Sequence, residues 1–268
     1  MTNMTNHRPT RGPLNPWPGE TRSMELSRML RQVLEYQRHY TSSSTPLMRE
    51  RNRLIKRELP YALYRGLIQQ QLAIPTGRLQ VNPSTGSGRN AEIPLVQITD
   101  SKMSTTVRRG WYLVLLFAGD GSSVFASLNK TSTEERRGTD GQYRFTPLPA
   151  SATRTEREWA LSQIEGIHIE VSQPLLRNRI NLRSRGTTGQ AYERTHVAGV
   201  QYARLDIPDD EVILADLAQL TVLLSAVYNA LPESGPPPPT PKENQGWLKG
   251  DPCEQHGFPW CANCKSIN

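Results

Sequence analysis

The residues with the most recognisable chemistry lie near the end of the chain. The ligand-type residues follow the spacing C-x2-H-x4-C-x2-C, formed by Cys253, His256, Cys261 and Cys264. Thiolate and imidazole groups are ligands that zinc prefers, and each closely spaced pair can chelate one side of a tetrahedral ion. Four protein ligands leave no open position on the metal. The pattern therefore predicts a structural zinc site in a short knuckle-like tail, with free thiols in an unliganded tail as the alternative.

A second candidate is a stretch of concentrated positive charge between Leu175 and Arg194, which holds a single acid, Glu193. Its arginines are Arg177, Arg179, Arg183, Arg185 and Arg194. Tyr192 and Tyr202 flank its C-terminal side. A flexible arginine-rich loop beside aromatic rings suits neutralisation of a nucleic-acid backbone and stacking on a base. We therefore predict DNA contacts from this stretch, with a solvated loop as the alternative.

Two further segments supply candidate contacts to DNA phosphates. Residues 75–91 are rich in Gly, Ser, Thr and Asn, and small residues let a backbone approach phosphates closely. The candidates in this segment are Arg78, Arg89 and Asn90. Arg108 and Arg109 form a basic pair directly before an aromatic and apolar run. For residues 75–91 the alternative is a polar connection without a ligand.

Catalytic patterns are sparse in this sequence. Asp100-Ser101-Lys102 matches a fragment of the Asp/Glu-x-Lys pattern of metal-dependent nucleases, but such a site requires a further upstream acid. The sequence has no G-x-x-x-x-G-K-[ST] phosphate-binding loop, no dinucleotide fingerprint and no nucleophile elbow. We therefore predict a binding protein without catalytic activity. A metal-dependent nuclease that uses Asp100 and Lys102 is kept as an alternative.

The composition favours a polyanionic partner. The 268 residues hold 32 Lys and Arg against 25 Asp and Glu, which gives a net charge of +7. Such a basic balance attracts nucleic acid but also occurs without it. The N-terminal residues contain no apolar signal segment, and three cysteines argue against a disulfide framework. The apolar run Val212–Leu231 carries Asp216 and other polar residues, so we expect a buried helix, no membrane partner and a cytoplasmic location.

The stretch from Glu92 to Lys130 is expected to position these residues. It contains three short apolar runs, Pro94–Thr99, Trp111–Ala118 and Ser123–Leu128. Runs this short predict strands rather than helices, and Gly119-Asp-Gly favours a hairpin turn between the last two. Side chains alternate across a strand, so Trp111 and Tyr112 should lie on opposite faces. Only one of these two rings can therefore line a given pocket.

The rest of the pattern predicts helices around a small central sheet, which is an α+β (mixed α/β) fold. Helices are expected at residues 23–34, 47–59, 61–72, 131–137, 156–164 and 207–231. Short strands are expected near Val81 and at residues 167–171 and 198–205, and a loop at 138–153. Pro60 should interrupt the second helical stretch. The acids after Ile207 suit the positive N-terminus of the last helix.

Several separated blocks resemble one known family. They are Gly86–Asp100, Gly110–Phe117, Ala126–Asn129 and Ile207–Leu217. In order and spacing they are similar to the McrB N-terminal DNA-binding domain family (MrcB-like N-terminal domain) across about residues 23–231. The resemblance implies a mixed α/β fold. It also implies a protein that recognises modified cytosine, of the 5-methylcytosine type, by flipping the base into a pocket.

The resemblance further implies where the base pocket lies. It places Tyr112 and Leu116 at the pocket wall, and it places Leu95 where family members commonly have Trp. We expect Tyr192 and Tyr202, beside the arginine-rich stretch, to belong to the same pocket. Because Leu95 lacks an aromatic plane, this chain is expected to differ from the family in the base it accepts or in stacking geometry.

These observations divide the chain into four parts. We expect a disordered N-terminus at residues 1–20, a modified-DNA-binding domain at 21–232, a proline-rich linker at 233–246 and the zinc-binding tail at 247–268. In restriction systems this family's domain is usually fused to a GTP-driven motor. Since no nucleotide-binding loop occurs here, we expect a reader of modified double-stranded DNA that works alone or with a separate effector nuclease or motor. A protein- or RNA-interaction module with a basic face is the other alternative.

Overall fold

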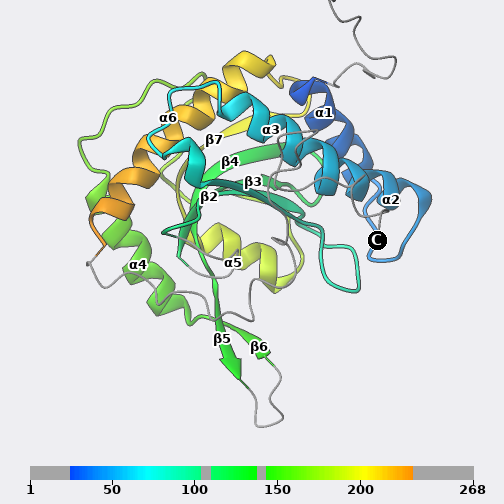
Figure 1. Ribbon diagram of the computed structural model, residues 1–268. Helices are drawn as coiled ribbons and strands as arrows, with labels where there is room; N and C mark the ends of the chain where they lie inside the picture. Colours follow the sequence, from blue (N-terminus) through cyan, green and yellow to red (C-terminus); the bar gives the residue numbers. More distant parts are fainter. Residues whose placement is uncertain (1–24, 104–109, 138–142, 232–268) are drawn as a thin grey trace, which may run out of the picture.

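The computed structural model describes residues 25–103, 110–137 and 143–231. Its centre is a five-stranded antiparallel sheet with the strand order β1-β2-β3-β4-β7 (Figure 1). The strands are β1 (Leu79–Ser84), β2 (Leu95–Asp100), β3 (Trp111–Phe117), β4 (Ser123–Lys130) and β7 (His196–Ala203). The predicted mixture of helices and a small central sheet is confirmed, whereas the predicted tail lies outside the described residues.

The middle of the sheet is the predicted three-strand unit. β3 is buried along its whole length, which explains its nearly continuous apolar sequence. It pairs with β4 from Trp111↔Lys130 to Phe117↔Val124. The turn between them needs glycine, since Gly121 has a φ of +70° and an added Cβ would lie 2.3 Å from the Leu34 carbonyl oxygen. The hairpin turn therefore packs directly against the first helix.

Helices α1, α3 and α6 cover one face of the sheet, and α5 covers the other (Figure 1). The six α-helices of the described residues are α1 (Leu26–Gln37), α2 (Pro46–Arg53), α3 (Leu59–Leu67), α4 (Ala150–Gln163), α5 (Thr187–Thr195) and α6 (Asp210–Asn229). A 3-10 turn, Thr76–Arg78, precedes β1. We call the face under α1, α3 and α6 the first face and the face under α5 the second face.

The chain around Pro60 differs from the prediction. A π-helical turn, Leu54–Glu58, joins α2 to α3, so Pro60 does not separate two helices but sits near the start of α3. The Leu59 amide bonds to the carbonyl of Leu54, five residues back. Proline cannot donate a hydrogen bond and its ring crowds the preceding turn, so a wider turn accommodates it.

The acids at the start of α6 lie in its first turn, as predicted, and one of them, Asp210, also caps a second helix. The Asp210 carboxylate accepts hydrogen bonds from the amides of Leu26 and Ser27, both at 2.7 Å. These amides belong to the first turn of α1 and have no partner within their own helix. Asp210 therefore ties the N-terminus of α1 to that of α6, across 184 positions of the chain.

Three other predicted elements differ from the structure. The helix expected at residues 131–137 is instead strand β5 (Thr133–Arg137), which pairs antiparallel with β6 (Tyr143–Pro147) in a unit that projects from the body (Figure 1). The loop expected at residues 138–153 therefore contains β6 and the first turn of α4, while residues 138–142 lie outside the described residues. A cap followed by acids marks only a first helical turn and does not by itself extend a helix. Residues 167–171 are not a strand. They run along α6, where the Ser172 amide donates to Asp216 at 2.7 Å.

Helix α6 is long and apolar enough to cross a membrane by length and composition alone. In the fold it behaves as a core helix, because Leu217, Leu220 and Leu224 are fully buried in the core of the first face. A core helix of a soluble protein meets the same length and composition criteria.

Candidate nucleic-acid interface

The second face carries its own apolar cluster, separate from the core of the first face. Its members are Ile93, Leu95, Tyr112, Val114, Leu116, Ala118, Phe125, Ile180 and Leu182, with Leu176 and Tyr192 partly buried against them. We call this set the second-face cluster. Strands β2, β3 and β4 provide its floor, while residues 176–182 and α5 provide its cover.

Trp111 and Tyr112 lie on opposite faces of β3, as predicted. Trp111 belongs to the first-face core, where its ring centroid lies 5.8 Å from that of Trp159. The ammonium of Lys130 lies 5.5 Å from the Trp111 centroid. Tyr112 belongs to the second-face cluster. Of these two rings, only that of Tyr112 can therefore contribute to a site beneath α5.

Four of the five predicted pocket residues come together. Leu95 and Leu116 are direct partners across β2 and β3, and both share the second-face cluster with Tyr112 and Tyr192. Tyr202 is placed elsewhere. Its ring is buried in the first-face core, and its hydroxyl donates to Asp216 at 2.7 Å. Tyr202 therefore cannot share a pocket with the other four residues.

The second-face cluster is closed in this structure. Tyr112 is 1% exposed, and its hydroxyl donates to the Lys130 carbonyl at 3.3 Å. Burial raises the pKa of Tyr112 and raises the pKa of Tyr192 to about 12. Both phenols are therefore neutral at physiological pH. They can offer ring faces and hydroxyl hydrogen bonds to a ligand, but not acid–base chemistry.

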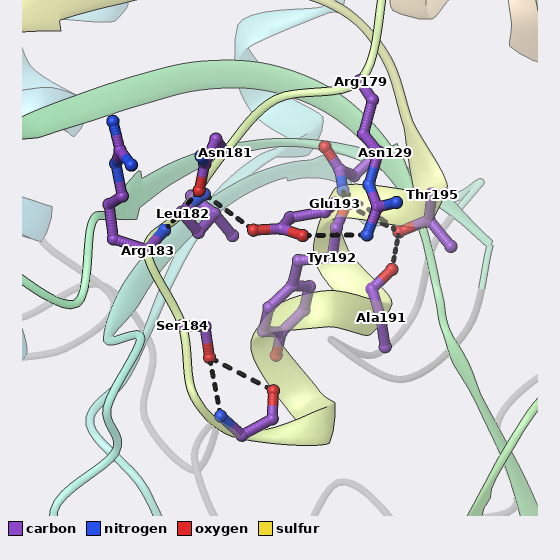
Figure 2. Close-up of polar contacts among 11 residues, drawn as sticks. Asn129, Arg179, Asn181, Leu182, Arg183, Ser184, Ala191, Tyr192, Glu193 and Thr195 are labelled. Carbon is purple, nitrogen blue, oxygen red and sulfur yellow. Dashed lines mark hydrogen bonds and ion pairs between the residues drawn. The ribbon is translucent and has the colours of Figure 1, made fainter.

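The arginine-rich stretch is fixed in place rather than flexible, and its second half is helix α5. The buried Glu193 carboxylate of α5 accepts hydrogen bonds from the Leu182 amide at 2.8 Å and from Arg179 at 3.2 Å (Figure 2). Figure 2 also shows the Tyr192 ring beside the segment from Leu182 to Ser184. The single acid of this stretch therefore anchors it from within.

A second acid, Glu92, holds the same segment from outside. Its carboxylate accepts hydrogen bonds from the Ser184 hydroxyl at 2.7 Å and from the amides of Arg185 and Gly186 at 2.8 and 2.9 Å. Partial burial favours the neutral acid, but these hydrogen bonds outweigh it and lower the pKa of Glu92. Glu92 therefore stays ionised and fixes the main chain of the arginine-rich segment.

The arginines of this segment differ in what they offer a ligand. The side chains of Arg183 and Arg185 are exposed, and the main chain of Arg183 has a φ of +53°. Arg179 is paired with Glu193 but is 66% exposed at its side chain. Arg177 is half-buried, and its guanidinium lies 3.5 Å from the Ile167 carbonyl oxygen. Arg183 and Arg185 are therefore the freest to meet a phosphate.

The other predicted DNA contacts do not form one surface. Arg78 precedes β1 and pairs with Asp100 at 2.6 Å, at the opposite end of the sheet from Arg89 and Arg185. Asn90 is used internally, since its side chain bonds to the loop between α1 and α2 and to Asn52. Arg89 is exposed. Arg108, Arg109 and the four predicted zinc ligands lie outside the described residues.

The structure does not favour the nuclease alternative, because the carboxylate of Asp100 is already occupied by other groups. Asp100 is 1% exposed; one oxygen bonds Arg78 and the other accepts the Lys102 amide at 2.9 Å. Within residues 25–103, 110–137 and 143–231, no group of three or more His, Cys, Asp or Glu side chains is arranged to hold a metal ion. Asp100 therefore acts as a structural partner of Arg78.

Sequence reasoning missed a buried polar row on the second face. Asn129 of β4 donates to the Tyr192 carbonyl at 2.9 Å and to the Thr195 hydroxyl at 3.1 Å, which fixes the end of α5. Ser127 and His196 lie beside it, with His196 Nδ1 2.5 Å from the Ser127 hydroxyl. Burial lowers the pKa of His196 to about 4, so the ring is neutral. Polar residues at alternate positions of β4 are the signal that would have identified this row.

These features define an α+β module with a buried aromatic cluster beneath an arginine-bearing cover. The model of the family described as MrcB-like, N-terminal domain matches residues 33–229, so the chain belongs to this family and contains a McrB-type DNA-binding module. The matched span lies inside the predicted domain, residues 21–232. No curated protein and no solved structure matches the chain.

Proposed function

We propose that the protein binds double-stranded DNA and reads a modified cytosine of the 5-methylcytosine type, which is flipped out of the duplex toward the second face. One observation supports this most directly. Leu95, Leu116, Tyr112 and Tyr192 share one cluster beneath the arginine-bearing segment. An apolar site with aromatic planes suits a methylated base, and nearby arginines suit the phosphates of a distorted duplex.

The closed cluster implies that binding requires a local movement. Tyr112 is fully buried on the rigid central strand, whereas Tyr192 is only partly buried, on the covering helix α5. Tyr192 is therefore the side chain to be displaced by an entering base. Flipping costs a few kcal/mol, and stacking on an aromatic ring returns about 1–3 kcal/mol per base.

Binding to matched duplexes with and without 5-methylcytosine tests this function. The measurement is fluorescence anisotropy at several salt concentrations, because phosphate contacts make affinity fall as salt rises. We expect tighter binding to the modified duplex and a strong salt dependence for both. Equal affinities for the two duplexes, or an affinity that does not change with salt concentration, contradict the proposal. A preference for single-stranded RNA or a co-purifying protein favours the interaction-module alternative instead.

We propose a cellular setting that follows from this activity. A reader without a catalytic site marks modified DNA for a separate effector nuclease or motor, as in a modification-dependent restriction or defence system in the cytoplasm. Incubation of the purified protein with magnesium and modified DNA should leave the DNA intact. Cleavage that is abolished by Asp100→Ala contradicts the non-enzymatic reading.

We also propose that the C-terminal tail binds one structural zinc ion through Cys253, His256, Cys261 and Cys264. The support is the ligand spacing in the sequence. Metal analysis of the purified chain should find about one zinc per chain, because four such ligands complete a tetrahedral site. A Cys261→Ser variant that keeps its full zinc content contradicts the assignment.

A further inference from the structure

The loop between β1 and β2 is shaped by glycines that cannot be replaced without strain. Gly86 and Gly88 have φ values of +98° and +75°. A Cβ on Gly86 would lie 2.3 Å from the Arg89 carbonyl oxygen, whereas a Cβ on Gly88 would meet nothing within 4 Å. The loop is therefore tightly curled at its start and open to solvent at its tip.

The tip of this loop presents main-chain amides and a guanidinium that have no partner among the described residues. Residues 86 to 89 are exposed. Within the described part of the chain, no hydrogen bond engages their four main-chain amides, and no ion pair or hydrogen bond engages the Arg89 guanidinium. Curled backbone segments with successive free amides are common binding sites for phosphate oxygens.

The base of the loop is held firmly. The Asn90 amide donates to the Ser42 carbonyl, and its side chain donates to the carbonyls of Thr41 and Ser43 at 3.1 and 2.7 Å. Asn52 donates to the Asn90 side-chain oxygen at 2.8 Å. The free amides therefore stand on a rigid support, which lowers the entropy cost of binding a ligand.

A buried cation lies behind this support. Arg51 is 0% exposed, and in the described ranges its guanidinium bonds only to neutral oxygens, those of Gln37, Asn52 and Ala91. Burial lowers the pKa of Arg51 to about 10, so it remains charged at neutral pH. Glu92 directs its carboxylate to the amides of Arg185 and Gly186 instead. The positive potential of Arg51 is therefore not cancelled by a bonded acid.

We propose that residues 86 to 89 form a binding site for a DNA phosphate group, in which the free amides and the Arg89 guanidinium contact the phosphate. Arg51 and Asn90 are positioning residues that hold this loop from behind. The proposal rests on the proposed DNA binding and adds to it a phosphate site on a loop outside the second-face cluster. An exposed connecting loop that meets no ligand is the competing explanation.

The salt dependence of duplex binding tests the proposal. Arg89→Ala should reduce the magnitude of the slope of log affinity against log salt by about 0.9, which is the loss of one phosphate contact. Arg28→Ala is the matched control. Arg28 is an exposed arginine of α1. It lies nine positions before Gln37, the α1 residue that bonds to Arg51 behind the loop, which is roughly 13 Å along the helix. Its removal should therefore leave the slope unchanged.

A second variant separates positioning from direct contact. Asn90→Ala removes no charge, yet it should reduce the slope by the same amount as Arg89→Ala, because the freed loop no longer presents its amides and Arg89 together. The double variant should then bind about as well as either single variant. Additive losses contradict the positioning role of Asn90. Should Asn90→Ala fail to fold, as judged by thermal unfolding, amide NMR shifts of residues 86 to 89 on adding duplex to the wild-type chain decide the matter.

The outcomes separate this proposal from the proposed function. A wild-type chain that prefers modified duplex, with identical slopes for Arg89→Ala and Arg28→Ala, overturns the phosphate site and leaves the DNA reader intact. Absent amide shifts at residues 86 to 89 in saturated complex overturn it as well. A wild-type chain that binds no duplex overturns both.

Discussion

The carboxylate of Glu92 accepts a hydrogen bond from the main-chain amide of Arg185 at 2.8 Å, across 93 positions of the chain. This contact joins the segment before β2 to the segment that covers the second face. It places the exposed Arg185 side chain near the β1–β2 loop that carries Arg89, at one end of the sheet. An acid thus organises a basic surface by binding its main chain.

Glu92→Ala should weaken DNA binding, although it removes a negative charge from a basic surface. Loss of charge alone would tighten binding to DNA, whereas loss of the three hydrogen bonds releases the Ser184–Gly186 segment. We expect a roughly tenfold loss of affinity, equivalent to about 1.4 kcal/mol. The control is Glu158→Ala, which removes an exposed acid of α4. Tighter binding by Glu92→Ala than by the wild-type chain contradicts the positioning role.

Tyr192→Leu should remove the preference for modified cytosine while keeping the fold. Leucine retains much of the apolar volume but has no ring on which a base can stack, so the preference should fall by roughly tenfold. Tyr202→Phe serves as the comparison, because its hydroxyl bonds to Asp216 on the first face. That variant should lose about 1–3 kcal/mol of stability with its base preference unchanged. An unchanged preference in Tyr192→Leu argues against a pocket beneath α5.

Arg78→Ala should affect stability rather than DNA binding. Its loss leaves the buried Asp100 carboxylate without the partner at 2.6 Å, which should lower the free energy of unfolding by about 1–3 kcal/mol. Arg185→Ala should show the reverse pattern, with the salt slope reduced by about 0.9 and little change in stability. Denaturant unfolding and anisotropy titrations measure both quantities. A reduced salt slope in Arg78→Ala would place DNA at the other end of the sheet.

His196 should make the fold less stable in acid. Its folded-state pKa is lowered to about 4, mainly by burial, from an ordinary value of 6.5. Between these values the unfolded chain binds a proton that the folded chain does not, so the free energy of unfolding falls as pH drops from 6.5 toward 4. Urea unfolding across this range should show the loss in the wild-type chain and a smaller loss in His196→Gln. Identical pH slopes for the two proteins contradict the assignment.

Much of the sheet could be predicted from local sequence pattern. The apolar runs around Leu95, Trp111 and Phe125 are short and bounded by turn residues, and alternation alone separated Trp111 from Tyr112. The five candidate pocket residues came from the resemblance and from proximity in sequence to the arginines. Proximity in sequence gave the wrong position for Tyr202, because the side chain of this β7 residue points toward the first face.

Other parts of the site depend on contacts between distant residues. Helix α5 contains three threonines and a glycine, which are poor helix formers, and it is stabilised by Asn129 and by the contacts of Glu193. The role of Glu92 depends on a contact with Arg185 that no local pattern encodes. Asp210 likewise caps a helix that begins far away in the sequence. Because no local pattern encodes such long-range hydrogen bonds, the sequence alone predicts a flexible loop for the arginine-rich stretch.

The most direct test of the central claim is the fluorescence of 2-aminopurine placed next to a 5-methylcytosine in a duplex. This probe brightens when its neighbouring base leaves the stack, so it reports base flipping separately from binding. We predict a rise in fluorescence with the wild-type chain on modified duplex, a smaller rise on unmodified duplex, and a reduced rise with Tyr192→Leu. Saturated binding to modified duplex without any rise in fluorescence would contradict the account.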